Sequence, residues 1–159
     1  MSLKKEKRIP TIEKSIEVNV PEYTVYAQWT KFEEFPQFME GVKEVKRLDA
    51  KRFHWKAEIV GQDTEWDTEI TEQTADQRLA WTSRGSDIKG WVVTFHHLSN
   101  ARSKIMLELE YDPQGFSENV GDAVGVVSSR VQGDLERFKA LIEKRWVPIR
   151  PETIFDEIF

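Results

Sequence analysis

The chain has 159 residues, a formal net charge of −5 and no cysteine. This length predicts one domain with a substantial core, and the acidic balance gives no electrostatic reason to expect a nucleic-acid partner. The lack of cysteine excludes disulfides, thiolate zinc sites and thiol nucleophiles, and no apolar run approaches the ~20 residues of a membrane span, so we expect a cytoplasmic protein.

Residues 1–11 are interpreted as an N-terminal extension. A strand is predicted at residues 11–20, where branched aliphatic residues mostly alternate with polar ones. A helix follows because Pro21 suits a helix start, and Pro36 interrupts the next apolar run. We therefore predict two short helices, at residues 22–30 and 31–35, that close one end of a sheet.

Residues 42–113 are predicted to form six further strands. Large apolar residues alternate with charged ones along most of this region, so one face of the sheet is apolar and the other faces solvent. This pattern is typical of antiparallel hairpins. The inward-facing set includes six large rings, Trp55, Trp66, Trp81, Trp91, Phe95 and Tyr111.

A long helix is predicted from about Ser117 to Arg145. Its apolar residues recur at steps of three and four and form one stripe: Val120, Val124, Val127, Val131, Leu135, Phe138 and Ile142. Gly121, Gly125 and Gly133 lie among them, and each lowers helix propensity by about 1 kcal/mol relative to Ala. We interpret these glycines as places where the sheet or a bound molecule closely approaches the helix, so that Gly125→Leu is expected to fill part of a cavity.

The last segment, residues 146–159, cannot continue this helix because it contains Pro148 and Pro151. Beyond them, Ile154 and Phe155 belong to an apolar set spaced for one face of a helical turn. Disordered segments are usually poor in such residues. We expect this tail to pack on the domain or across a homodimer.

Several blocks of sequence resemble a known superfamily. They are Trp29–Phe35 with Pro36, Glu69–Glu72, Val93–His96, Leu109–Pro113 and Asp134–Phe138. In this order they resemble the START-like (SRPBCC, helix-grip) superfamily, in particular its polyketide cyclase/dehydrase and coenzyme-Q-binding branch, over residues 12–145. The resemblance implies an α+β fold of order βααββββββα, in which a curved antiparallel sheet of six or seven strands wraps around the last helix. It also implies an internal hydrophobic cavity for a lipid, quinone or polyketide-like molecule.

The candidate ligand-binding residues are the inward rings and the helix stripe. They are Trp29, Phe35, Trp55, Trp66, Trp81, Trp91, Phe95, Tyr111, Val124, Val127 and Val131. Large rings at inward positions together with helix glycines are typical of cavity walls, although rings can equally fill a core.

Few titratable groups are predicted to face that cavity. The strand carboxylates Glu58, Glu65, Asp67, Glu69, Glu108 and Glu110 fall at outward positions. His97 shares inward parity at a strand end, where a partly exposed rim position is expected, and Tyr111 is either a core residue or a hydrogen-bond donor to a ligand. Arg130 lies beside the helix stripe, where it forms a surface ion pair or anchors the polar end of a ligand.

No nucleophile elbow, phosphate-binding loop, dinucleotide fingerprint or metal-ligand spacing occurs, and we expect no cofactor or metal. Cyclisation or dehydration of a poly-β-keto chain needs a placed acid or base. The sequence therefore favours a binding or transport protein for a hydrophobic small molecule over an enzyme. The alternatives are a polyketide cyclase/dehydratase and a scaffold or stress-related interaction module without a ligand.

Overall fold

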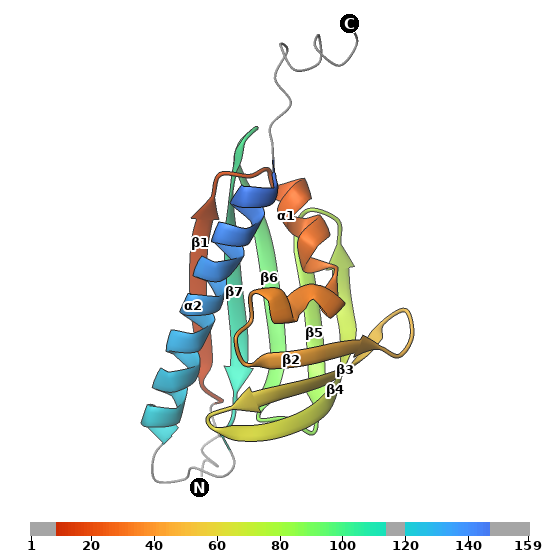
Figure 1. Ribbon diagram of the computed structural model, residues 1–159, viewed down its shortest axis with the longest axis vertical. Coiled ribbons are helices and arrows are strands. Elements are labelled where there is room, and N and C mark those ends of the chain that lie inside the picture. Colours follow the sequence, from red (N-terminus) through yellow and green to blue (C-terminus); the bar gives the residue numbers. More distant parts are fainter. Residues whose placement is uncertain (1–8, 114–119, 147–159) are drawn as a thin grey trace, which may run out of the picture.

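The computed structural model describes residues 9–113 and 120–146, and it has the predicted α+β helix-grip architecture. One antiparallel sheet has the strand order β1-β7-β6-β5-β4-β3-β2, and the long helix α2 lies along its concave side (Figure 1). The elements are β1 (Thr11–Val18), α1 (Glu22–Trp29), the 3₁₀-helix η1 (Phe32–Gln37), β2 (Val42–Arg47), β3 (Arg52–Ile59), β4 (Gln62–Thr74), β5 (Arg78–Arg84), β6 (Ile88–Ser99), β7 (Arg102–Tyr111) and α2 (Val120–Arg145).

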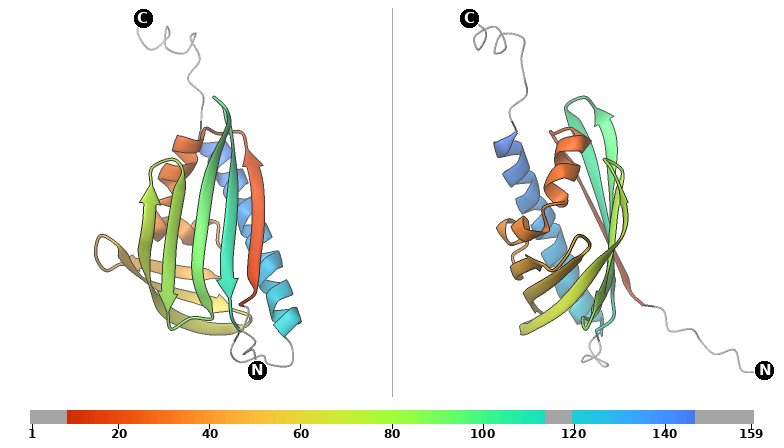
Figure 2. Two further views of the ribbon diagram at one scale, coloured as in Figure 1. Left: turned by 180° about the vertical axis from the view of Figure 1, so that it is seen from behind. Right: turned by 90° about the vertical axis from the view of Figure 1, so that its right-hand side faces the viewer.

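The sheet is strongly bent, and all helices of the described chain lie on one side of it (Figure 2). Strands β2, β3 and β4 run across the direction of β5, β6 and β7, so they curl toward α2 (Figure 1). Register shifts between Ile70 and Glu72 in β4 and between Val42 and Glu44 in β2 mark irregularities of the kind that bend strands. The bend turns the sheet into a trough that faces α2.

The predicted alternation of the strands is confirmed most clearly in β7. Ile105, Leu107 and Leu109 are buried, whereas Met106 and Glu108 between them are exposed. Successive side chains of a strand point to opposite faces. One face of the sheet therefore supplies the core, and the other is the outer surface of the molecule.

The second short helix differs from its predicted form. It is a 3₁₀-helix from Phe32 to Gln37 that includes Pro36, whereas the sequence predicted a helix that ends before this proline. Proline costs a short helix little, because only one donor is lost and the last residues of so short an element need few internal hydrogen bonds. Phe32 and Phe35 of this helix are fully buried.

Helix α2 ends at Arg145 as predicted, whereas the expected start near Ser117 lies outside the described residues. Its buried apolar residues are Ala123, Val127, Val131, Leu135, Phe138 and Ile142. The N-terminal part of the stripe is thus centred on Ala123 rather than on Val124, which is only half-buried. This rotation decides which face meets the sheet.

The interpretation of the α2 glycines is wrong for this structure. Gly121 and Gly125 are exposed, and a Cβ added to either would meet no atom within 4 Å. A Cβ on Gly133 would meet the guanidinium of Arg137 at 3.1 Å, which is the end of a flexible side chain rather than the sheet. Because these glycines point away from the trough, Gly125→Leu would not fill a cavity.

The end of the trough near α1 is filled with aromatic rings. Trp29 of α1 contacts Phe35, Phe38 and Phe138, with ring centroids 5.5 Å apart in each pair. Phe32 stacks on Phe53 at 4.4 Å. These rings form a packed core at this end of the trough.

The C-terminal tail that was expected to dock on the domain or on a second copy lies outside the described residues, except for Trp146. Trp146 is half-buried and packs against the core, and its amide donates a hydrogen bond to the Ile142 carbonyl at 3.0 Å.

Candidate functional site

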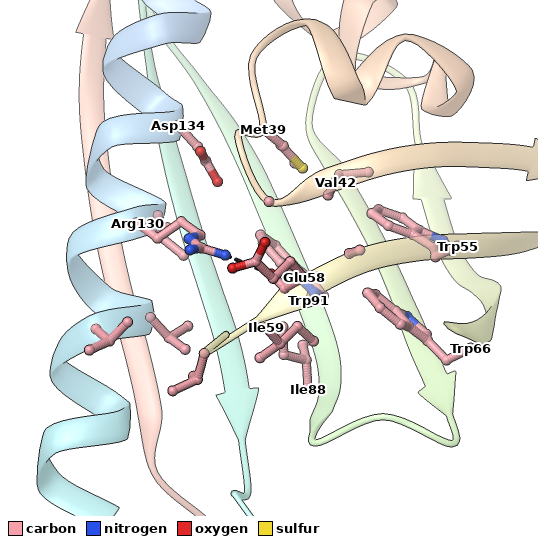
Figure 3. Close-up of a pocket in the computed structure, with 16 residues that line it drawn as sticks. Met39, Val42, Trp55, Glu58, Ile59, Trp66, Ile88, Trp91, Arg130 and Asp134 are labelled. Carbon is pink, nitrogen blue, oxygen red and sulfur yellow. Dashed lines mark hydrogen bonds between the residues drawn. The ribbon is translucent and has the colours of Figure 1, made fainter. Parts of the chain in front are cut away.

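A cleft lies between the middle of α2 and the curled strands β3 and β4 (Figure 3). The enclosed space is small, about 50 Å³, and the volume reaches about 520 Å³ only when the open mouth is counted. Its lining residues are Met39, Gly41, Val42, Trp55, Ala57, Glu58, Ile59, Val60, Trp66, Ile88, Trp91, Val126, Val127, Arg130, Val131 and Asp134. Most of these side chains are apolar.

One wall of the cleft belongs to a stack of four tryptophans. The pairs Trp66–Trp55, Trp55–Trp81 and Trp81–Trp91 have centroid distances of 5.7, 6.3 and 5.7 Å and interplanar angles of 17°, 24° and 14°. Strand register produces the two outer pairs, because Trp55 lies opposite Trp66 and Trp81 lies opposite Trp91. The indole of Trp55 is held by a buried hydrogen bond from its Nε1 to the Thr68 hydroxyl at 2.7 Å. The wall is therefore a fixed surface of near-parallel aromatic rings.

The polar side of the cleft comes from α2. Arg130 and Asp134 are four residues apart, so they project from the same face of the helix, and both reach toward the loop before β2 (Figure 3). The Nη1 of Arg130 donates a hydrogen bond to the Glu58 carbonyl at 2.6 Å. Gly41 makes room for this contact, because a Cβ there would lie 2.5 Å from that nitrogen.

Asp134 is a buried carboxylate at the cleft. Its Oδ1 accepts hydrogen bonds from the Glu40 amide at 3.1 Å and from the guanidinium of Arg137. Burial raises the pKa of Asp134 above its ordinary value, although the hydrogen bonds from Arg137 and Glu40 act in the opposite direction. A carboxyl with a raised pKa beside a cleft can exchange a proton nearer to neutral pH than a surface carboxyl can.

The structure separates the sequence-predicted ligand residues into two groups. Trp55, Trp66, Trp91, Val127 and Val131 line the cleft. The others do not line it: Trp29, Phe35, Trp81, Phe95 and Tyr111 are buried in the core, and Val124 is half-buried beside it. Parity along a strand identifies the inward face, but it cannot show which inward rings are covered by α1 and η1.

Tyr111 was expected to face the ligand cavity, but it does not line the cleft. It is fully buried, and its hydroxyl has no hydrogen-bond partner among the described residues. It borders a separate hollow near Ser86 and Asp87 rather than the cleft. Burial, and to a lesser extent the charge of Asp87, raises the pKa of Tyr111.

His97 and the strand carboxylates offer no acid or base to the cleft, apart from Glu58. His97 is exposed, next to a register shift in β6, and its Nδ1 lies 3.0 Å from a carboxylate oxygen of Glu22 on α1. Its exposure agrees with the expected rim position, but the side chain does not belong to the buried face of β6 as its place in the alternation predicted. Glu65, Asp67, Glu69, Glu108 and Glu110 are exposed as predicted, whereas Glu58 is half-buried at the cleft.

Sequence reasoning missed several lining residues, above all Asp134. The spacing of Arg130 and Asp134 places an opposite-charge pair on one turn of a helix, and this was a usable signal. No sequence signal indicated Gly41 or Met39, because their positions depend on how the loop after η1 packs against α2.

The described residues contain no group of three or more histidine, aspartate or glutamate side chains that could hold a metal ion. Within the same residues, no helix is long and apolar enough to cross a membrane.

Residues 18–140 match the family model described as polyketide cyclase/dehydrase and lipid transport, and the chain belongs to this family. An uncharacterised 17.2 kDa protein of Streptomyces lincolnensis is 47% identical over 135 residues, which cover 84% of this chain and 90% of that protein. Its description assigns no activity.

Solved structures of low sequence identity share the fold. The Zhui aromatase/cyclase from Streptomyces sp. R1128 superposes with a TM-score of 0.73 at 12% identity, covering 87% of this chain and 96% of that one. A START superfamily protein from Mycobacterium smegmatis gives a TM-score of 0.61 at 16% identity, with 80% and 97% covered. These similarities establish the START-like fold, which supports many functions.

Proposed function

We propose that this protein binds a hydrophobic small molecule in the cleft between α2 and the curled strands, without transforming it. The observation that carries the proposal is the cleft wall formed by Trp55, Trp66 and Trp91, opposite apolar side chains of α2. Rigid aromatic faces bind apolar and planar groups well. The family description and the START-like neighbours support a role of this kind.

A cyclase or dehydratase is the second candidate function, and Asp134 is the observation that favours it. It is a buried carboxyl with a raised pKa that borders the cleft, so it is the group best suited to accept or donate a proton there. Its fixed hydrogen bonds to Arg137 and to the Glu40 amide equally suit a structural role. An aromatase/cyclase among the structural neighbours supports considering this reaction class.

Native mass spectrometry of the full chain as expressed, compared with its denatured mass, tests the binding proposal. We expect an additional mass that organic extraction releases. Ala57→Leu, which places a larger side chain in the cleft, is expected to lose that mass while remaining folded, whereas Ala140→Leu on the exposed side of α2 is the matched control and should retain it. Equal loss or equal retention in both variants contradicts binding in this cleft.

The two candidate functions differ in the expected effect of Asp134→Asn. A binding protein retains ligand in this variant, and the released molecule is chemically the same as that from the wild type. A cyclase or dehydratase lacking its acid or base accumulates unconverted substrate instead, and turnover of a poly-β-keto substrate falls by about 100-fold or more. A third possibility, an interaction module, predicts no bound mass at all.

A further inference from the structure

Arg130 is the only cation among the described residues that line the cleft, where the charge of Asp134 acts on it although the two form no ion pair. Within the described residues its hydrogen bond goes from Nη1 to a backbone carbonyl, that of Glu58, at 2.6 Å. Within the described chain it forms no ion pair with a carboxylate. A guanidinium carries five N–H donors in a planar fork, so most of its donors remain for another acceptor.

The two carboxylates that line the cleft, Asp134 and Glu58, differ in their partners. Asp134 is bonded to Arg137 of the next helical turn. Glu58 forms no ion pair among the described residues, since the nearby Lys43 is paired with Asp63 at 2.7 Å. Arg130 is therefore the one positively charged group among the described lining residues that still has donors free for a ligand.

The contacts of the Arg130 side chain with β3 and Gly41 fix its position. The side chain crosses from α2 to the end of β3 over Gly41, where any larger residue would collide with both Nη1 of Arg130 and the Glu58 carbonyl, at 2.5 and 2.8 Å. Trp55 and Trp66 stand on the opposite side of the cleft from Arg130 (Figure 3). A molecule that spans the cleft would meet aromatic faces at one end and a guanidinium at the other.

We propose that Arg130 selects the polar end of the ligand, so that the molecule bound in the cleft is an amphipathic monocarboxylate whose apolar part lies against Trp55 and Trp66. A carboxylate matches the planar donors of a guanidinium, and this charge-assisted pairing is among the stronger polar contacts in proteins. A single negative charge fits better than two, because Asp134 lies one helical turn away and would repel a dianion. This inference rests on the proposed binding function and names its ligand class.

The test compares two ligands that differ only in the end group. Dodecanoate and dodecanol displace the neutral fluorescent probe 1-aminoanthracene from the full-length protein, both below the concentrations at which they aggregate. The wild type is expected to bind dodecanoate about tenfold more tightly than dodecanol, as one charge-assisted hydrogen bond allows. Arg130→Gln should reduce this ratio to about one and change dodecanol affinity by less than about twofold.

Two further variants serve as controls. Arg102→Gln removes an exposed arginine that pairs with Glu17 far from the cleft and should leave the ratio unchanged. Arg130→Lys retains the charge without the planar fork, so an intermediate ratio is expected. If Arg130→Gln does not fold because the Glu58 carbonyl loses its donor, the role of Arg130 is tested by comparing the preference for dodecanoate over dodecanol in the wild type and in Arg130→Lys.

The outcomes distinguish this inference from the binding proposal. If both ligands bind the wild type equally, or if Arg130→Gln keeps the preference for dodecanoate, the assignment of Arg130 is overturned while binding in the cleft stands. If neither ligand nor the probe binds the wild type, the proposed function fails together with it.

Discussion

A single glycine determines how the cleft is closed at its polar side. Gly41 follows η1 at the point where the chain turns into β2, and the Arg130 side chain packs directly against it. A backbone hydrogen bond also joins the two segments here: the Glu58 amide donates to the Gly41 carbonyl at 2.8 Å. The absence of a side chain at this residue is therefore what allows α2, β2 and β3 to meet.

Gly41→Ala is expected to destabilise the protein by about 1–3 kcal/mol, because its Cβ meets a backbone oxygen that cannot easily move. Urea denaturation followed by tryptophan fluorescence measures the change. Gly125→Ala is the matched control: it lies in open space on α2 and should stabilise the helix by up to about 1 kcal/mol. A Gly41→Ala protein as stable as the wild type would contradict the close contact described here.

The second prediction at this scale concerns the ionisation of Asp134. Because burial raises its pKa in the folded state, the proton is bound more tightly in the folded than in the unfolded chain. The stability that this group contributes is fully present below its unfolded pKa and is lost as the pH rises through its folded pKa.

Asp134→Asn removes this titration. The free energy of unfolding of the wild type minus that of Asp134→Asn should therefore increase as the pH falls from about 7 to about 4. Urea titrations of both proteins across this range measure the difference, and Glu136→Gln, an exposed carboxylate on the same helix, is the control. A difference that is constant or decreases toward acid pH would show that burial does not dominate at Asp134.

At the scale of the elements, the stack of tryptophans depends on pairing between strands. β3 and β4 place Trp55 opposite Trp66, and β5 and β6 place Trp81 opposite Trp91. Pairs of aromatic residues across strands stabilise sheets and fix their register. The bend in the sheet then brings Trp55 against Trp81, although their strands are not adjacent.

Thr68→Val is expected to destabilise the protein by about 1–3 kcal/mol, because it leaves the buried Nε1–H of Trp55 without an acceptor while conserving side-chain volume. Thr82→Val, an exposed threonine in β5, should change stability by less than about 0.5 kcal/mol. Chemical denaturation compares the two variants. Equal effects would mean that the hydrogen bond contributes nothing specific to the wall.

At the scale of the whole molecule, the trough between sheet and α2 has a filled half and an open half. Phe138 of α2 packs against Trp29 and Phe38, which joins the helix to α1 and η1 at the filled end. The cleft occupies the other half, between Val127, Val131 and the tryptophans of β3, β4 and β6. The packed ring cluster and the cleft thus lie along different turns of the same helix.

Phe138→Ala should lower the free energy of unfolding by about 3–5 kcal/mol, since it opens a cavity among rings that have no other way to fill it. Val126→Ala, at an exposed α2 residue, is expected to cost less than about 0.5 kcal/mol. Urea unfolding gives both values, and the denaturant dependence should remain that of a single transition. A small loss in Phe138→Ala would mean that α2 does not depend on the ring cluster for its docking.

The sequence by itself determined the order of the elements, the inward face of most strands and the C-terminal end of α2, because these depend on local periodicity. It also identified Trp55, Trp66 and Trp91 as inward rings, and the structure places them at the cleft. Only the tertiary structure decided which inward rings are covered, because η1 fills half of the trough with side chains distant in sequence. The same applies to the polar side: the contact of Arg130 with Glu58 over Gly41 joins three segments, and local patterns carry no information on how such segments meet.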